Sequence, residues 1–128
     1  MKYFFILIST LLLVSCKESF EEMDTEMFNK EIIQNTSIKS PEELILNYYN
    51  FSSSEGKPTF QITKNEIDKN VFEIILIHDN QQDDAQKAEK VIIIDEKIGD
   101  KWSVKKISRN WKCYDGRGHT DWGIENCN

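Results

Sequence analysis

Four side chains near the C-terminus have the chemistry to bind a ligand. They lie between Cys113 and Cys127, and they are Tyr114, Arg117, His119 and Trp122. Arg117 carries a planar set of donors that matches a carboxylate or a phosphate, and the two aromatic rings offer flat apolar contact. His119 can donate or accept a hydrogen bond and titrates near neutral pH. The sequence therefore predicts a ligand-binding loop, in which a glycine on each side of Arg117 allows positive φ angles.

A purely structural role for the same loop is the alternative. Trp122 would then cover the end of a sheet, and Arg117 would pair with Asp115 or Asp121. A hydrolase that uses His119 with a nearby carboxylate is a further alternative, but no serine stands in a nucleophile-elbow context. We therefore predict no catalytic residue and no enzyme activity.

Metal binding has little support in the sequence. A zinc site at His119 and Asp121 would need the strand that carries His78 and Asp79 to end beside the loop. Two histidines without helical or finger spacing are a poor zinc pattern, and we expect His78 to be a surface residue at a strand end. The acidic residues that follow Asp79 lack the alternating spacing and the glycine of a calcium loop. The sequence predicts no metal and no other cofactor.

A short apolar run precedes Cys16. It follows Lys2 and extends from Tyr3 to Val14, which is too short to span a bilayer. Its closing residues, Leu13-Val14-Ser15-Cys16, resemble the lipobox of bacterial lipoproteins. In that family the cysteine receives a diacylglycerol on its sulfur and becomes the first residue after cleavage. The resemblance implies that residues 1–15 are a lipoprotein signal peptide and that Cys16 is lipidated; an ordinary signal peptide that contains a cysteine is the alternative.

The residues after Cys16 bear on the destination of the chain. Lys17 and Glu18, with Glu21 and Glu22 close behind, resemble the surface-export signal of Bacteroidota lipoproteins. That resemblance implies a cell-envelope protein anchored to the outer membrane by its lipid and exposed at the cell surface. A plain polar tether is the alternative.

The remaining cysteines, Cys113 and Cys127, form an even pair in an oxidising compartment. We therefore predict a disulfide between them. It would close a loop of ~15 residues, for which chain entropy gives about 3 kcal/mol of stabilisation.

The net charge of −6 argues against nucleic acid as a partner. It would suit a basic partner, so an inhibitor of a basic envelope-attacking enzyme such as lysozyme is an alternative function. Our leading prediction is a non-enzymatic protein. It would bind the membrane through the lipid on Cys16 and an envelope protein or small ligand through the C-terminal loop.

Two helix-start patterns precede the strands. Ser19-Phe20-Glu21-Glu22 has the form of a capping box, and apolar residues at helical intervals, including Met27, predict a helix from there to about Gln34. Ser40-Pro41-Glu42-Glu43 predicts the start of a second helix through Tyr49. The polar residues 52–56 predict a turn after it.

Four strands are expected after that turn. Their predicted ranges are Thr59 to Thr63, Val71 to Asp79, Val91 to Asp95 and Trp102 to Lys112. Residues 97–101 supply a hairpin turn with Gly99 at its centre. The apolar phase of the last strand shifts near Lys105 and Lys106, which predicts a β-bulge.

This order of elements predicts an α+β fold, with one or two N-terminal helices packed on a four-stranded antiparallel meander. The order, and the run from Gly99 to Val104, resemble small cystatin-like and NTF2-like secreted domains of bacteria. The closing Cys…Gly-Arg-Gly-His…Trp…Cys segment resembles that of small exported bacterial proteins, which implies a recurring module and no activity. The expected organisation is a signal peptide at 1–15, a tether and helix at 16–39, and an α+β domain with a disulfide loop at 40–128.

Overall fold

The computed structural model describes residues 17–50 and 59–128. The predicted signal peptide, Cys16 and the predicted turn at 52–56 lie outside these residues. No helix within the described ranges is long and apolar enough to cross a membrane.

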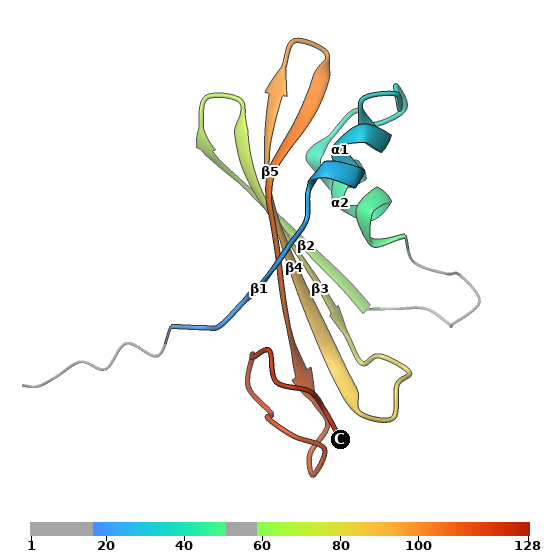
Figure 1. Ribbon diagram of the computed structural model, residues 1–128, viewed down its shortest axis with the longest axis vertical. Helices are drawn as coiled ribbons and strands as arrows, with labels where there is room; N and C mark the ends of the chain where they lie inside the picture. Colours follow the sequence, from blue (N-terminus) through green and yellow to red (C-terminus); the bar gives the residue numbers. More distant parts are fainter. Residues whose placement is uncertain (1–16, 51–58) are drawn as a thin grey trace, which may run out of the picture.

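The described residues form one antiparallel sheet with two helices on one of its faces (Figure 1). The strand order is β1-β5-β4-β3-β2. The elements are β1 Glu21–Met23, α1 Glu26–Ile32, α2 Pro41–Tyr49, β2 Thr59–Asp68, β3 Val71–Asp79, β4 Gln86–Ile98 and β5 Lys101–Cys113. The predicted α+β class is confirmed, whereas the predicted count of four strands is wrong because β1 adds a fifth.

The core lies between the helices and the half of the sheet nearer the β4–β5 hairpin (Figure 1). Alternate residues of the central strands point to this face, as the period of two requires. The fully buried aliphatic side chains come from α2, β3, β4 and β5, and they are Leu44, Ile45, Ile74, Leu76, Val91, Ile93 and Ile107. The packing of these side chains holds the helices on the sheet, because buried apolar area is the main favourable contribution to folding.

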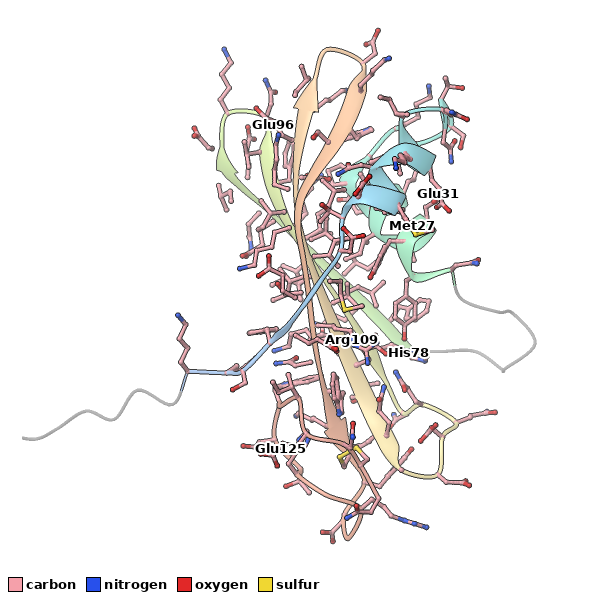
Figure 2. All side chains as sticks on the ribbon, viewed as in Figure 1. Met27, Glu31, His78, Glu96, Arg109 and Glu125 are labelled. Carbon is pink, nitrogen blue, oxygen red and sulfur yellow. A yellow bond between two sulfur atoms is a disulfide. The ribbon has the colours of Figure 1, made fainter. Side chains whose placement is uncertain are left out.

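The predicted helix from Ser19 to about Gln34 is wrong in its first half. Residues 21–23 instead pair with β5, where Glu21 lies opposite Arg109 and Met23 opposite Ile107. The helix begins only at Glu26, and Met27, predicted on its apolar side, is 74% exposed (Figure 2). Pairing with the edge of β5 satisfies backbone groups of both strands, and this tertiary gain overrides the local capping pattern.

Three other local signals are confirmed. Ser40 caps α2 by accepting a hydrogen bond from the Glu43 amide at 3.2 Å, and Pro41 occupies the first helical position. Gly99, with φ of 61°, turns the chain between β4 and β5. The register of these strands shifts between Val104 and Lys106, which places the predicted bulge at Lys105. β3 has the predicted limits, whereas β2, β4 and β5 are longer than predicted.

Both β1 and Asn29 of α1 cover the outer edge of β5. The side-chain amide of Asn29 on α1 donates to the carbonyl of Val104 at 2.9 Å, and its oxygen accepts from the amide of Val104 at 2.8 Å. Asn29 thus takes the place of a strand neighbour and satisfies both backbone polar groups of Val104. Such protection matters because an exposed strand edge is open to pairing with other chains.

Replacing Asn29 by alanine should lower the free energy of unfolding by about 1–3 kcal/mol, because both groups of Val104 lose their partner. Asn29→Asp should also be destabilising, because it keeps the acceptor for the Val104 amide but turns a carboxylate oxygen toward the Val104 carbonyl oxygen. Urea unfolding of the two variants beside Asn47→Ala, an exposed asparagine of α2, measures this. Equal stability of the Asn29 and Asn47 alanine variants would contradict the role given to Asn29.

One carboxyl group lies in the core without a partner. Asp95 on β4 is 0% exposed, its strand neighbours are Phe72 and Val104, and neither of its oxygens has a hydrogen-bond partner among the described residues. Burial, with a smaller contribution from the charge of Glu42, raises the pKa of Asp95 to about 7. The fold therefore carries a group that is neutral under mildly acidic conditions and costly to ionise.

Candidate functional site

The chain after β5 forms a loop closed by a disulfide between Cys113 and Cys127, with a Cα–Cα distance of 5.6 Å, so the predicted disulfide is confirmed. The loop lies at the end of the sheet opposite the β4–β5 hairpin (Figure 1). It folds back along β5, where Trp111 and Gly123 exchange two backbone hydrogen bonds of 2.9 and 3.0 Å. The indole of Trp111 also donates to the carbonyl of Glu125 at 2.9 Å. The loop thus continues the edge protection of the sheet.

Gly118 is the glycine that the loop requires. Its φ is 147°, and a Cβ placed there would lie 2.9 Å from the sulfur of Cys113. Gly116 also has a positive φ, of 78°, but a Cβ there would meet nothing within 4 Å. The backbone therefore packs directly against the disulfide at Gly118 and is open at Gly116.

This difference supplies a matched pair of variants. Gly116→Ala should lower the free energy of unfolding by about 1 kcal/mol, because alanine is strained at a positive φ. Gly118→Ala should lower it by about 2–4 kcal/mol, because the added methyl group also displaces the disulfide. Urea unfolding of both oxidised variants measures the difference. Equal losses would show that the backbone at residue 118 is not packed on the sulfur.

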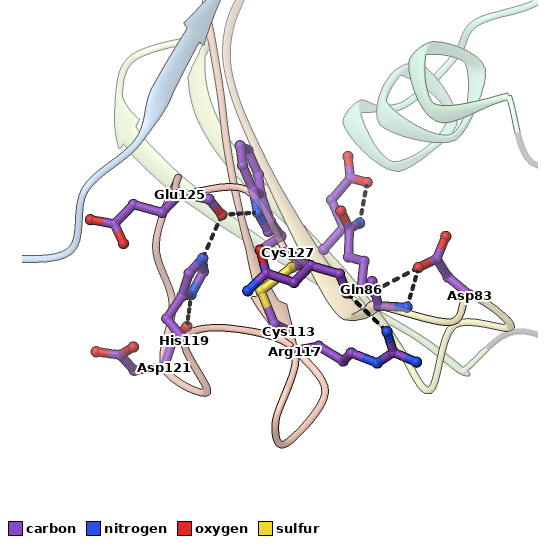
Figure 3. The surroundings of a disulfide bond; sticks show 12 residues. Asp83, Gln86, Cys113, Arg117, His119, Asp121, Glu125 and Cys127 are labelled. Carbon is purple, nitrogen blue, oxygen red and sulfur yellow. Dashed lines mark hydrogen bonds between the residues drawn. A yellow bond between two sulfur atoms is a disulfide. The ribbon is translucent and has the colours of Figure 1, made fainter.

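His119 is held by two backbone carbonyls of its own loop (Figure 3). Its Nδ1 lies 2.9 Å from the carbonyl oxygen of Asp121, and its Nε2 lies 2.8 Å from that of Glu125. The carbonyl of Asp121 contributes most to raising the pKa of His119, partial burial opposes this, and the carbonyl of Glu125 and the nearby carboxylates add to it. Both ring nitrogens face carbonyl oxygens of the loop, which leaves neither nitrogen open to a substrate.

Trp122 lies over two lysines on the face of the sheet that the helices do not cover. The ammonium of Lys90 is 4.4 Å from the ring centroid of Trp122, and that of Lys112 is 4.6 Å from it. These distances fall within the range of cation–π attraction. Lys90 also donates to the carboxylate of Glu18 at 2.8 Å, which holds the pKa of that carboxyl below its usual range. The loop and the N-terminal residues are thereby joined through Lys90.

A surface pocket of about 400 Å³ lies between the N-terminal residues and the loop. The residues 17–19 form one wall, and residues 119 and 121–125 form the other. The amide of Asn110 fixes the first wall by donating to the carbonyl of Ser19 at 3.1 Å and to Glu18 at 3.3 Å. The disulfide and His119 fix the second. The pocket is thus built from the two ends of the described chain.

The structure brings together two of the four predicted binding residues. His119 and Trp122 line the pocket, whereas Tyr114 and Arg117 are not among its lining residues. Tyr114 donates its hydroxyl proton to the carbonyl of Gln81 at 2.9 Å, and Arg117 donates to the carbonyl of Asn128 at 3.3 Å. Among the described ion pairs, Arg117 makes none with Asp115 or Asp121. Both side chains brace the loop from outside the pocket.

The sequence reasoning missed the N-terminal wall. Glu18 and Ser19 lie far from the loop along the chain, and their role depends on the pairing of β1 with β5, which the capping pattern concealed. The sequence does contain one indication of a contact on this face of the sheet, at Lys90. It stands on β4 beside the buried Val91, so the alternation of a strand places it on the face opposite the core.

The predicted surface position of His78 is wrong. His78 is 8% exposed and lies on the helix-covered face, where its Nδ1 is 2.7 Å from the hydroxyl of Tyr49 (Figure 2). Within residues 17–50 and 59–128, the one cluster of three possible metal ligands is Cys113, His119 and Cys127, and both of its sulfurs are in the disulfide. The zinc alternative that joins His78 to His119 therefore has no geometric support among the described residues.

Comparison with known proteins gives no relative from which to transfer a role. No protein-family model, no curated protein and no solved structure matches this chain.

Proposed function

We propose that this chain is a non-enzymatic lipoprotein of the cell envelope that binds a ligand in the pocket between its lipid anchor and its disulfide loop. The observation that carries the proposal is the position of that pocket. One wall consists of residues 17–19, which directly follow the lipobox cysteine, and the other belongs to the loop that the sequence singles out. The helices on one face of a five-stranded sheet are compatible with the cystatin-like layout, which remains part of the proposal.

The pocket has the features of a site for a small ligand or a projecting side chain. Its walls are held by a disulfide, by backbone pairing and by the contact of Glu18 with Lys90, so little conformational entropy remains to be lost on binding. Trp122 and Ile124 offer apolar contact, and Asp121 and Glu125 offer carboxylates. This mixture is typical of a binding site in which a few polar groups orient an apolar contact.

The anchor is tested by metabolic labelling with an alkyne-bearing fatty acid. We expect the native chain to carry the label and to fractionate with the outer membrane, and Cys16→Ser to lose both properties. A labelled Cys16→Ser variant, or an unlabelled native chain, would contradict lipidation at this residue.

The pocket is tested by crosslinking in intact cells followed by mass spectrometry of what is captured. Trp122→Ala with Ile124→Glu removes the apolar contact of the pocket, and Arg117→Ala serves as the matched control because it changes the same loop outside the pocket. We expect a ligand or partner that is captured by the native chain and by the control and lost in the pocket variant. The same capture by all three chains would remove the pocket as the binding site.

The inhibitor alternative is favoured by one observation, the acidic character of the chain and of this loop. The net charge is −6, and Asp121 and Glu125 are exposed. If the chain inhibits a basic enzyme, purified protein should lower the activity of a lysozyme, and Asp121→Asn with Glu125→Gln should weaken that effect. The hydrolase alternative has the least support, because both nitrogens of His119 are held by carbonyls.

A further inference from the structure

We propose that His119 is a proton-controlled latch of the loop: the closed pocket wall requires a doubly protonated ring, and loss of one proton loosens residues 119–125. This inference deepens the proposed function, because it concerns regulation of the same pocket. It stands on the two hydrogen bonds of the ring and on the contacts that connect those bonds to the pocket wall.

The count of donors and acceptors fixes the state of the ring. A carbonyl oxygen only accepts hydrogen bonds, and the neutral imidazole has a single N–H donor. His119 nevertheless places Nδ1 at 2.9 Å from one carbonyl oxygen and Nε2 at 2.8 Å from another. Both contacts are hydrogen bonds only when both nitrogens carry protons, so the closed loop selects the imidazolium.

The two carboxylates of the loop act in the same direction as the carbonyls. Asp121 and Glu125 of the loop each favour the cation, and the other ionisable side chains lining the pocket are Glu18 and Lys17 from the N-terminal residues. From the side of β5 the ring has as neighbour the sulfur of Cys113, which is in the disulfide and carries no charge. The pKa of His119 is accordingly raised above its ordinary value, first by the carbonyl of Asp121.

Loss of one of the two hydrogen bonds of His119 affects the loop wall of the pocket, because the ring is packed into that wall. A Cβ at Gly123 would lie 3.2 Å from the ring, so the ring and this backbone are in close contact. The carbonyl of His119 accepts from the amide of Cys113 at 2.9 Å, which connects the residue to the end of β5. When the ring is neutral, one nitrogen lone pair faces a carbonyl oxygen, and the two acceptors repel each other. The segment that carries Asp121 or Glu125 must then move away.

The sign of the effect follows from linkage. The closed loop binds the proton more tightly than the open loop, so closure is favoured at low pH and weakens as the pH rises through the pKa of the ring. The loop should open about tenfold more often for each pH unit by which the pKa in the closed loop exceeds that in the open loop. Two independent measurements, the pKa and the opening, must therefore agree.

The experiment is an NMR titration of the disulfide-bonded protein without any ligand. The ¹⁵N shifts of the ring report protonation of each nitrogen, and hydrogen exchange of the Cys113 and Gly123 amides, which bond to His119 and Trp111, reports opening of the loop. We expect two protonated nitrogens below the midpoint and reduced protection of both amides above it, with the amide of Ile93 in the central sheet unchanged. His119→Gln should remove the pH dependence of loop protection.

A ring with one bare nitrogen at pH 6 would overturn the inference, as would loop protection that does not change across the titration. The native titration decides this even if His119→Gln does not fold. Because the titration uses no ligand, it can detect the latch even if the crosslinking experiment captures no partner. A partner captured by a chain without the latch would be detected in the same way. The failures of the two proposals are thus distinguishable.

Discussion

Asp95→Asn should make the protein more stable at pH 8 and leave its stability at pH 4 nearly unchanged. In the folded state the pKa of Asp95 is about 7, against an ordinary value of 3.8. The folded state therefore holds a proton that the unfolded chain releases, and stability is lost as the pH rises from about 4 to 7. Asparagine has nearly the same shape and cannot ionise. The gain of the variant over the native chain should grow by about 2–4 kcal/mol between pH 4 and pH 8.

Urea unfolding at a series of pH values measures this difference. Asp84→Asn is the matched control, because Asp84 is an exposed aspartate on the connection between β3 and β4. We expect the control to follow the native chain at every pH. A constant difference between Asp95→Asn and the native chain from pH 4 to pH 8 would show that the Asp95 carboxyl is not isolated in the core.

Reduction of the disulfide should lower the free energy of unfolding by about 3 kcal/mol, the value expected from chain entropy for a closed loop of ~15 residues. Cys113 and Cys127 are separated by 14 positions, and the loop they close carries one wall of the pocket. We expect Cys113→Ala with Cys127→Ala to show the same loss without a reductant. The pocket wall should be released before the sheet unfolds, because its remaining contacts are a few hydrogen bonds.

Tryptophan fluorescence separates these two events. Trp122 reports on the loop, whereas Trp102, which donates to the carbonyl of Ile38 at 3.2 Å, reports on the helix-covered core. In variants that keep one of these tryptophans, the two urea transitions should coincide in the oxidised chain and separate after reduction. Coincident transitions in both states would mean that the loop unfolds only together with the sheet.

The sequence predicted elements whose signals are local. Ser40 and Pro41 define the start of α2 by capping chemistry alone, and the hairpin at Gly99 needs only one positive φ. The run of β-branched and aromatic residues predicted β3 with the limits that it has, Val71–Asp79. The disulfide followed from counting cysteines once Cys16 was assigned to a lipid. Apart from the disulfide, each of these inferences depends on residues that are close together in the chain.

The features that failed depend on distant pairing. Glu21 and Glu22 support a helix locally, but their neighbours in space are on β5, more than eighty positions along the chain. His78 was expected at the surface because a histidine ends the strand, yet Tyr49 of α2 covers it. The pocket has the same origin, since its N-terminal wall exists only because β1 joins the sheet. Long-range contacts of this kind have no local signature.

If Cys16 carries a lipid, the attachment of residues 18–23 to the sheet limits how far the domain can travel from the membrane. Glu18 already bonds to Lys90, so a single residue, Lys17, separates Cys16 from the folded body, and the two Cα–Cα steps span roughly 7 Å when extended. Under the proposed anchoring, the pocket would remain at the height of the lipid headgroups. We expect its ligand to approach along the membrane plane, as a membrane component or a small diffusing molecule does. A bulky partner arriving from the surrounding fluid would collide with the bilayer.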